Sequence, residues 1–381
     1  MTGRLLKTTL QLTKELVAFP SVSDESNESV SQFVADRLSA LKFNIEWHSY
    51  IDEKGTTKVS IVGKRGGGQG GVAYMAHTDV VPAEDWSFES CGPFEPTESN
   101  SRVYGRGTCD MKGSLACAIV AASEVANERQ NQPLYFVVTS DEEVGMFGAK
   151  QVNSHSKFFQ EMVDSGSVGI VGEPTRLNVI HAHKGGQRLA IRARGRSAHT
   201  STNEGINANY QLIPALQELL SIREESETNP HYQNGMFDPP TLSWNMTIVN
   251  EPEAANVTPS LAQVNIFFRP MPNVDHQPLL RATKALCTKH GLEFELRDCV
   301  DPWHVPCESK WVQDMLRIVG EPQSHSVCFA TDGGILQRLQ RLLVCGPGDI
   351  QQAHRSDEWI SLEQLEQGVD VYRRAFEYWC T

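Results

Sequence analysis

The 381-residue sequence lacks several features that would assign it at once to a class of protein. Its nine cysteines include no C-x-x-C pair, which argues against a disulfide framework and against a zinc site built from thiolates. The chain has no G-x-S-x-G elbow and no H-E-x-x-H helix, which disfavours a serine hydrolase and a single-zinc protease. No segment recurs with a period of roughly 20–50 residues, so a repeat architecture is excluded.

Positive charge and long apolar runs are also scarce. The chain has 34 Lys and Arg residues against 47 Asp and Glu residues, a formal net charge of −13. This excess of negative charge, without basic residues interleaved with aromatics, disfavours nucleic acid or an anionic membrane as a partner. No apolar run approaches the roughly 20 residues that span a bilayer. Together with the cysteine pattern, this composition predicts a globular protein of a reducing compartment, and we expect the cytoplasm.

Short apolar runs alternate with helical patterns through the first part of the chain, as in an α/β protein with a mostly parallel sheet. The runs typical of buried strands are 72–76, 134–139, 168–171 and, near the C-terminus, 341–345. Residues 111–128 are rich in Ala and predict a helix, with Asp110 where an N-cap would stand.

The middle of the chain has a different pattern. Its expected order of strand, helix, strand, strand, helix and strand matches the ferredoxin-like split unit. These elements are expected at 189–194, 208–222, 241–249, 263–269, 278–290 and 293–297. We therefore predict a catalytic domain in two parts, 1–179 and 298–381, with a smaller α+β domain inserted at 180–297.

Imidazole and carboxylate groups follow the expected parallel strands. Open α/β sheets bind ligands at the carboxyl ends of their strands, and zinc accepts both kinds of group. The candidate ligands are His77, Asp110, Glu143, Glu173 and His354. Taken singly, each is more readily explained as an ordinary polar loop residue, but their joint placement favours a metal site. Two histidines and three carboxylates exceed what one tetrahedral ion needs and suit two ions that share a bridging carboxylate.

Two further carboxylates stand beside these candidates. Asp79, two positions after His77, could accept the ring N–H and fix the histidine tautomer, or it could be a turn residue. Glu142, next to Glu143, is the better candidate for a general base that takes a proton from water and delivers it to a leaving amine. His181 and His183 could share a metal on one strand face, but because the set of ligands is complete without them we expect them to pack as structural residues.

Four stretches resemble the metal-site motifs of the M20 metallopeptidase family. They are AHTD at 76–79, GRGTCDMKG at 105–113, SDEE at 140–143 and GEPT at 172–175. Within the family, the chain is similar to the branch of acetylornithine deacetylases and succinyl-diaminopimelate desuccinylases. The stretches CGPF at 91–94 and GPG at 346–348 favour the deacetylases, and the resemblance covers nearly the whole chain.

The resemblance implies a zinc-peptidase-like catalytic domain with two zinc ions per subunit, and cobalt suits the same donors. Asp110 would bridge the ions, with His77 and Glu173 on one of them and Glu143 and His354 on the other. Asp79 would then orient a ligand, and Glu142 would be the acid/base.

The inserted domain of the family mediates dimerisation, so the resemblance also implies a homodimer. It further implies that His199 polarises the scissile carbonyl and that Arg269 and Asn256 bind substrate. From the residues alone, His199 would be a surface histidine, and Arg269 could form an ordinary surface salt bridge.

The implied activity is hydrolysis of the amide of an N-acyl amino acid. The first candidate substrate is N-acetylornithine, which implies a role in arginine biosynthesis. Succinyl-diaminopimelate, another N-acyl amino acid such as acetylcitrulline, and a dipeptide are the alternatives. The substrate is open because ATDGG at 330–334 departs from the Ser/Thr/Gly-rich loop of the desuccinylases. A non-catalytic, metal-dependent amino-acid binding protein is the alternative of another class, and it would be expected to have lost Glu142, a ligand or His199.

Overall fold

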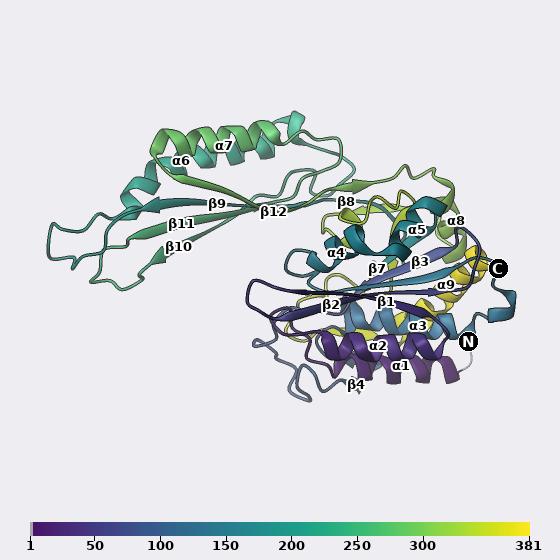
Figure 1. Ribbon diagram of the computed structural model, residues 1–381. Coiled ribbons are helices and arrows are strands. Elements are labelled where there is room, and N and C mark those ends of the chain that lie inside the picture. Colours follow the sequence, from purple (N-terminus) through teal and green to yellow (C-terminus); the bar gives the residue numbers. More distant parts are fainter. Residues whose placement is uncertain (1–2) are drawn as a thin grey trace. The chain divides into compact units, whose positions relative to one another are not determined.

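The computed structural model describes residues 3–381, apart from the side chain of Asp298. The chain divides into two compact units (Figure 1). The first unit comprises the residues up to 182 together with 304–325 and 331–381, and the second comprises 183–303 and 326–330. The second unit therefore starts three residues after the expected position 180 and ends after 303 rather than 297, with a short additional piece later in the chain.

The larger sheet has the strand order β1-β2-β6-β3-β7-β15-β8-β13, with β14 beside β8. Its strands are β1 (Asn44–Ile51), β2 (Thr57–Arg65), β3 (Val72–His77), β6 (Leu134–Thr139), β7 (Val168–Pro174), β8 (Ile180–His183), β13 (Trp303–His304), β14 (His325–Val327) and β15 (Leu342–Gly346). The central strands β6, β3, β7 and β15 run parallel, and every residue in them is buried. Strands buried on both faces give continuous apolar runs, which is why the sequence predicted these four.

Helices cover both faces of this sheet (Figure 1). Those of the first unit are α1 (Gly3–Val17), α2 (Glu28–Ala40), α3 (Gly113–Glu124), α4 (Phe147–His155), α5 (Lys157–Ser165), α8 (Lys310–Val319) and α9 (Leu362–Cys380). A small sheet in the order β16-β5-β4 joins Trp359–Ser361 to Arg102–Tyr104 and Thr97–Ser99. Among the described residues, no helix is both long enough and apolar enough to cross a membrane.

The expected start of the helix at residue 111 is wrong. A π-helical turn, Thr108–Lys112, comes first, and α3 begins at Gly113. Asp110 lies inside that turn with φ −121° and ψ 95°, and Lys112 rather than Asp110 stands at the N-cap position of α3. The cause is tertiary: the backbone N–H groups of Cys109 and Asp110 donate to the Glu358 carboxylate, which the local sequence does not reveal.

The second unit is an antiparallel sheet with the order β10-β11-β9-β12. Its elements are β9 (Gly186–Arg194), α6 (Ala208–Thr228), β10 (Asn245–Glu251), β11 (Leu261–Phe268), α7 (Gln277–His290) and β12 (Glu293–Val300). Both helices lie on one face of the sheet (Figure 1), and alternate residues of β11 are buried beneath them. The strand order and connections are those of the ferredoxin-like unit that the sequence predicted.

The two histidines of β8 fall in different units. His183 is fully buried, its Nδ1 lies 2.8 Å from the Lys184 carbonyl, and burial lowers its pKa to about 4. The His181 ring stands edge-on to that of His304, with 6.0 Å between the ring centroids. Neither histidine belongs to a group of metal-binding donors among the described residues.

Candidate metal centre

His77 closes β3 at the carboxyl edge of the larger sheet, and Asp110 faces it. The His77 Nε2 lies 3.1 Å from Asp110 Oδ1 and 3.8 Å from Glu173 Oε1. The other Asp110 oxygen, Oδ2, lies 3.5 Å from the Nε2 of His354, which in turn lies 3.0 Å from Glu143 Oε2. The Asp110 carboxylate therefore stands between two imidazoles, which is the arrangement expected of a bridging ligand.

Two overlapping sets of donor atoms could each hold a metal ion. One is His77, Glu142 and Glu173, and the other is His77, Asp110 and Glu143; within each set all donor atoms lie within 4.8 Å of one another. With His354 against Asp110 and Glu143, the structure brings all five predicted ligands together in the first unit. Imidazole nitrogens and carboxylate oxygens in this number suit zinc, and cobalt as well.

The carboxylates of this cluster repel one another in a buried site. Burial raises the pKa of Glu142, and the nearby Glu173 raises it further. Burial and Asp110 together likewise raise the pKa values of Glu143 and Glu173. Positive charge placed among these groups would stabilise their ionised forms, so the donor set fits divalent cations.

The carboxylates in turn favour the protonated, positively charged form of the imidazoles. Hydrogen bonds to Asp110 and Glu143 raise the pKa of His354 to about 10. For Asp110, burial pushes the pKa upward, but the hydrogen bonds from His354 and His77 outweigh it and the pKa falls. Protons on the histidines thus offset the carboxylates, and because metal ligands must be deprotonated, a bound cation would displace these protons.

Asp79 acts on the site differently from the sequence-based expectation. The His77 Nδ1 lies 2.9 Å from the backbone carbonyl of Asp79, whereas the nearest carboxylate oxygen is 3.7 Å away. The carbonyl therefore accepts the ring N–H and leaves Nε2 for a metal. The Asp79 carboxylate instead accepts from the backbone N–H groups of Glu142 (3.1 Å) and Glu143 (3.3 Å) and from the Ser23 hydroxyl (2.8 Å). Its side chain fixes the turn that carries the acid/base candidate.

Asp332 is a buried acid beside the cluster that the sequence did not single out. One of its oxygens accepts from the Thr139 hydroxyl at 2.5 Å, and the other, Oδ1, has no hydrogen-bond partner. Burial raises its pKa to about 6, and its charge acts on Glu142 and Glu173. The only sequence signal was its place in the 330–334 stretch that departs from the desuccinylase loop.

The three remaining candidates, His199, Asn256 and Arg269, lie in the second unit. His199 is exposed, and its Nδ1 lies 2.7 Å from the Ser201 hydroxyl. Its backbone pairs with Val257, so it stands beside Asn256, whose carbonyl accepts from the Thr200 N–H at 3.1 Å. Arg269 is partly buried, and its guanidinium carbon lies 4.7 Å from the centroid of the Phe267 ring.

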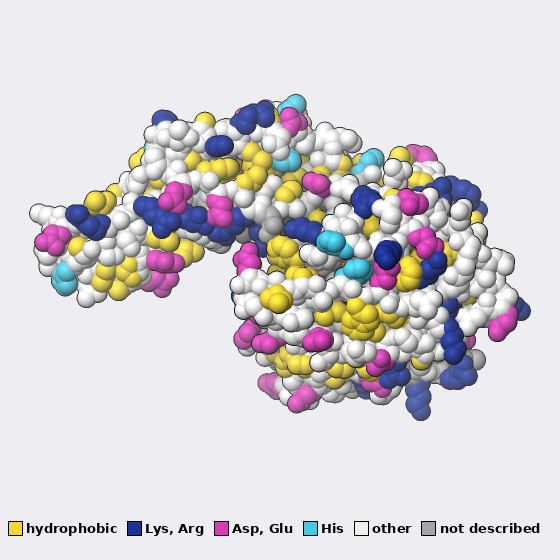
Figure 2. Space-filling view, viewed as in Figure 1, with side chains coloured by type: hydrophobic (Ala, Val, Ile, Leu, Met, Phe, Trp, Pro, Cys, Tyr) yellow, Lys and Arg dark blue, Asp and Glu magenta, His cyan; other side chains and the backbone are white. Residues whose placement is uncertain are grey.

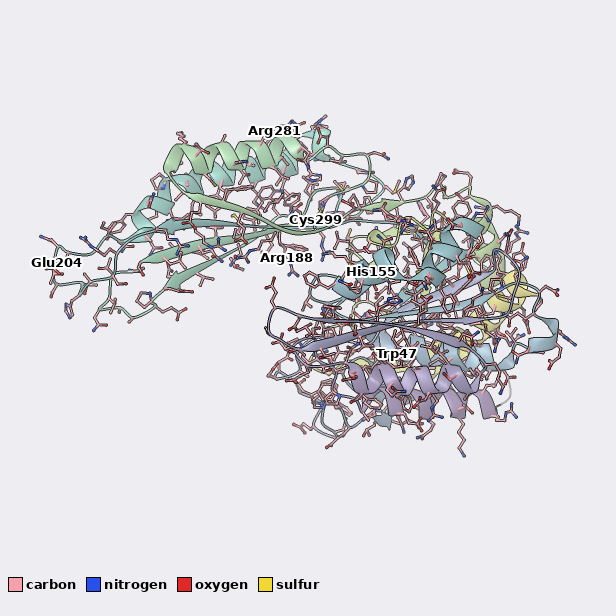
Figure 3. All side chains as sticks on the ribbon, in the orientation of Figure 1. Trp47, His155, Arg188, Glu204, Arg281 and Cys299 are labelled. Atoms are coloured by element: carbon pink, nitrogen blue, oxygen red, sulfur yellow. The ribbon has the colours of Figure 1, made fainter. Side chains whose placement is uncertain are left out.

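The second unit holds these candidates at opposite ends of β11. Val257 and Asn256 precede the strand, whereas Arg269 directly follows it. At about 3.4 Å per residue, the eight residues of β11 span roughly 24 Å. In Figure 3, Glu204, in the loop after His199, and Arg188, which pairs with Phe267, lie towards different ends of the second unit. A small ligand therefore cannot contact His199 and Arg269 of the same unit.

Imidazoles and carboxylates gathered at the carboxyl edge of a mostly parallel sheet, with a separate antiparallel unit, define the class of this protein as a metal-dependent hydrolase. Residues 73–378 match the family model of peptidase family M20/M25/M40, and the chain belongs to this family. The predicted family is thereby confirmed.

Relatives of known name are similar over the full length. The chain is 31% identical over 391 residues to acetylornithine deacetylase of Proteus mirabilis, covering 98% of this chain and 97% of that protein. It is 32% identical over 389 residues to acetylornithine deacetylase of Pasteurella multocida, covering 98% of each.

Solved structures share the fold at lower identity. Human carnosine dipeptidase 1 superposes with a TM-score of 0.74 at 16% identity, covering 98% of this chain and 96% of that one. The dipeptidase Dug1p from Saccharomyces cerevisiae gives 0.76 at 15% identity, covering 99% and 96%. These likenesses confirm the predicted α/β fold with a separate antiparallel unit.

Proposed function

We propose that this protein hydrolyses the amide of an N-acyl amino acid, and that N-acetylornithine is its substrate. The observation that carries the proposal is the likeness to acetylornithine deacetylases over 98% of the chain. The reaction would yield ornithine and acetate and would serve arginine biosynthesis. The nine cysteines of the chain include no C-x-x-C pair, which supports a reducing compartment such as the cytoplasm.

Two zinc ions would be held by the five predicted ligands, with Asp110 between them; cobalt would fit the same donors. The residues are His77, Asp110, Glu143, Glu173 and His354. Bound zinc supplies a Lewis acid that polarises an amide carbonyl and lowers the pKa of water.

Glu142 is suited to move the proton. Its half-buried carboxylate belongs to the cluster, and the hydrogen bond from its backbone N–H to Asp79 fixes the turn from which the side chain projects. As a base it would take a proton from the attacking water, and as an acid it would deliver that proton to the leaving amine. Burial raises the pKa of its carboxyl group and so favours the protonated form that the second step requires.

A panel of substrates tests this proposal. We expect zinc-loaded protein to release free amine from N-acetylornithine faster than from acetylcitrulline, succinyl-diaminopimelate or a dipeptide, and chelator-stripped protein to release none. Faster release from another member of the panel would change the proposed substrate but leave the proposed amide hydrolysis unchanged. If the zinc-loaded protein bound these compounds without releasing amine, the non-catalytic alternative would replace the proposal.

We also propose that the protein acts as a homodimer through its second unit. Apolar side chains are exposed there on α6 and on the edge strand β10: Tyr210 (75% exposed), Ile213, Leu220, Ile248 and Val249. Figure 2 shows such side chains at the surface of this unit among Lys and Arg residues. An edge strand offers unpaired backbone groups to a second copy. His199 and Arg269 of one chain are too far apart to contact the same substrate. In a dimer, the partner could supply His199 to a substrate held by Arg269.

Mixing two inactive variants tests this arrangement. His199→Ala and Glu142→Gln should each be nearly inactive alone. If His199 acts across the dimer, an equimolar refolded mixture should regain roughly a quarter of wild-type activity, because half of the dimers are mixed and half of their sites are intact. Mixed dimers that form, as native mass spectrometry would show, yet regain no activity would place His199 in its own subunit's site.

A further inference from the structure

Glu358 is a buried carboxylate, and both of its oxygens accept hydrogen bonds from a single loop. The residue is 1% exposed. Its Oε1 accepts from the backbone N–H groups of Cys109 (2.9 Å) and Asp110 (3.1 Å), and its Oε2 accepts from the N–H of Gly107 (2.9 Å). The Arg106 guanidinium donates to the same Oε2 at 2.9 Å. All four donors belong to the loop that presents the bridging candidate Asp110.

Arg106 extends this contact to two other segments. It too is 1% exposed, and its Nη1 also donates to the carbonyl of Arg355 at 2.9 Å, next to His354. Its Nη2 donates to the carbonyl of Pro82 at 3.2 Å, in the loop that follows His77 and Asp79. One ion pair therefore joins the three segments that carry His77, Asp110 and His354.

The Asp110 backbone needs such support. Its φ and ψ are not helical, so the hydrogen-bond ladder of α3 does not hold it. Buried backbone N–H groups require acceptors, and a carboxylate that accepts several of them fixes their positions. Pairing of Trp359 with Tyr104, between β16 and β5, places Glu358 beside the loop.

We propose that the buried Arg106–Glu358 pair is the positioning device of the metal centre, setting the separation of Asp110, His77 and His354 that cations require. The inference rests on the proposed metal site. Neither residue belongs to the groups of metal-binding donors among the described residues, so both would act through the ligands. A merely structural pair would change the stability of the fold and leave the zinc affinity of folded protein unaltered.

Zinc affinity of the full-length protein, measured by competition with a chromophoric chelator, separates these roles. Glu358→Gln keeps the size of the side chain but removes its charge and turns an amide N–H₂ toward backbone donors. We expect a 10–100-fold loss of zinc affinity, as for other residues that orient metal ligands. Activity should recover in part at saturating zinc, and the absorption of the cobalt-loaded variant should differ from that of the wild type.

Asp357→Asn is the matched control, because it removes one negative charge at the next position from a more exposed side chain that pairs with Arg355. It should bind zinc like the wild type. Arg106→Lys keeps the charge but cannot reach Glu358 and both carbonyls together, so it should lose affinity by a smaller factor.

The decisive comparison uses metal-stripped protein with the far-UV circular dichroism of the wild type. Folded Glu358→Gln with wild-type zinc affinity would overturn the inference while leaving the proposed function standing. If Glu358→Gln does not fold, Arg106→Lys decides, and wild-type affinity in that variant overturns the inference equally. A wild-type protein that binds no zinc would instead remove the proposed function, and this inference with it.

Discussion

Glu142→Gln is expected to lower kcat by about 10²–10⁴-fold, the usual contribution of a positioned general acid/base, while zinc content stays at the wild-type level. Glutamine has the same length but cannot carry the proton from water to the leaving amine. Its backbone N–H can still donate to Asp79, so the turn should persist. Steady-state kinetics with the preferred substrate, together with metal analysis of the same sample, test both parts of the expectation.

Glu143→Gln is the matched control, because it is the neighbouring carboxylate on the same turn. The Glu143 carboxylate contacts His354 and is predicted to be a metal ligand, so its loss should lower zinc affinity. The contrast matters because the donor atoms of Glu142, His77 and Glu173 lie within 4.8 Å of one another, so Glu142 could itself bind a metal ion. If Glu142→Gln lost zinc as readily as Glu143→Gln, Glu142 would be a metal ligand. If Glu142→Gln kept near-normal turnover, Glu142 would not be the general acid/base.

Most of the site could be predicted because its signal is local. A parallel strand buried on both faces gives an apolar run, and the polar residue at its carboxyl end must lie at the ligand-binding edge of the sheet. His77, Glu143 and Glu173 follow from that rule without knowledge of how the strands are ordered. The order of strands and helices in the second unit was also predicted from local patterns, although its antiparallel sheet is covered by helices on one face only.

What could not be predicted depends on partners far away in the sequence. Thr139 and Asp332 are 193 residues apart, and Asp110 and Glu358 are 248 apart. Which oxygen of Asp79 lies nearest the His77 ring depends on how the turn at Glu142 and Glu143 folds back, because that turn binds the Asp79 carboxylate. The separation of His199 and Arg269 depends on the bridge between His199 and Val257, which no local pattern gives.

Asp110→Ala is expected to cause the largest loss of metal among single substitutions in the site. The carboxylate lies 3.1 Å from the imidazole of His77 and 3.5 Å from that of His354, so its removal takes a donor from both predicted ions at once. Zinc affinity should fall by more than the 10–100-fold typical of residues that only orient ligands. Isothermal titration of metal-stripped protein, with circular dichroism to verify the fold, gives both affinity and stoichiometry.

Asp79→Ala is the comparison that makes this measurement sharp. The backbone carbonyl of Asp79 survives the substitution and still accepts the ring N–H of His77, so that ligand keeps its tautomer. The lost carboxylate releases the backbone N–H groups of Glu142 and Glu143, so turnover should suffer more than metal binding. A larger zinc loss in Asp79→Ala than in Asp110→Ala would contradict the bridging role of Asp110. Only Asp110 places a carboxylate between the two imidazoles, so its removal should cost the most zinc affinity.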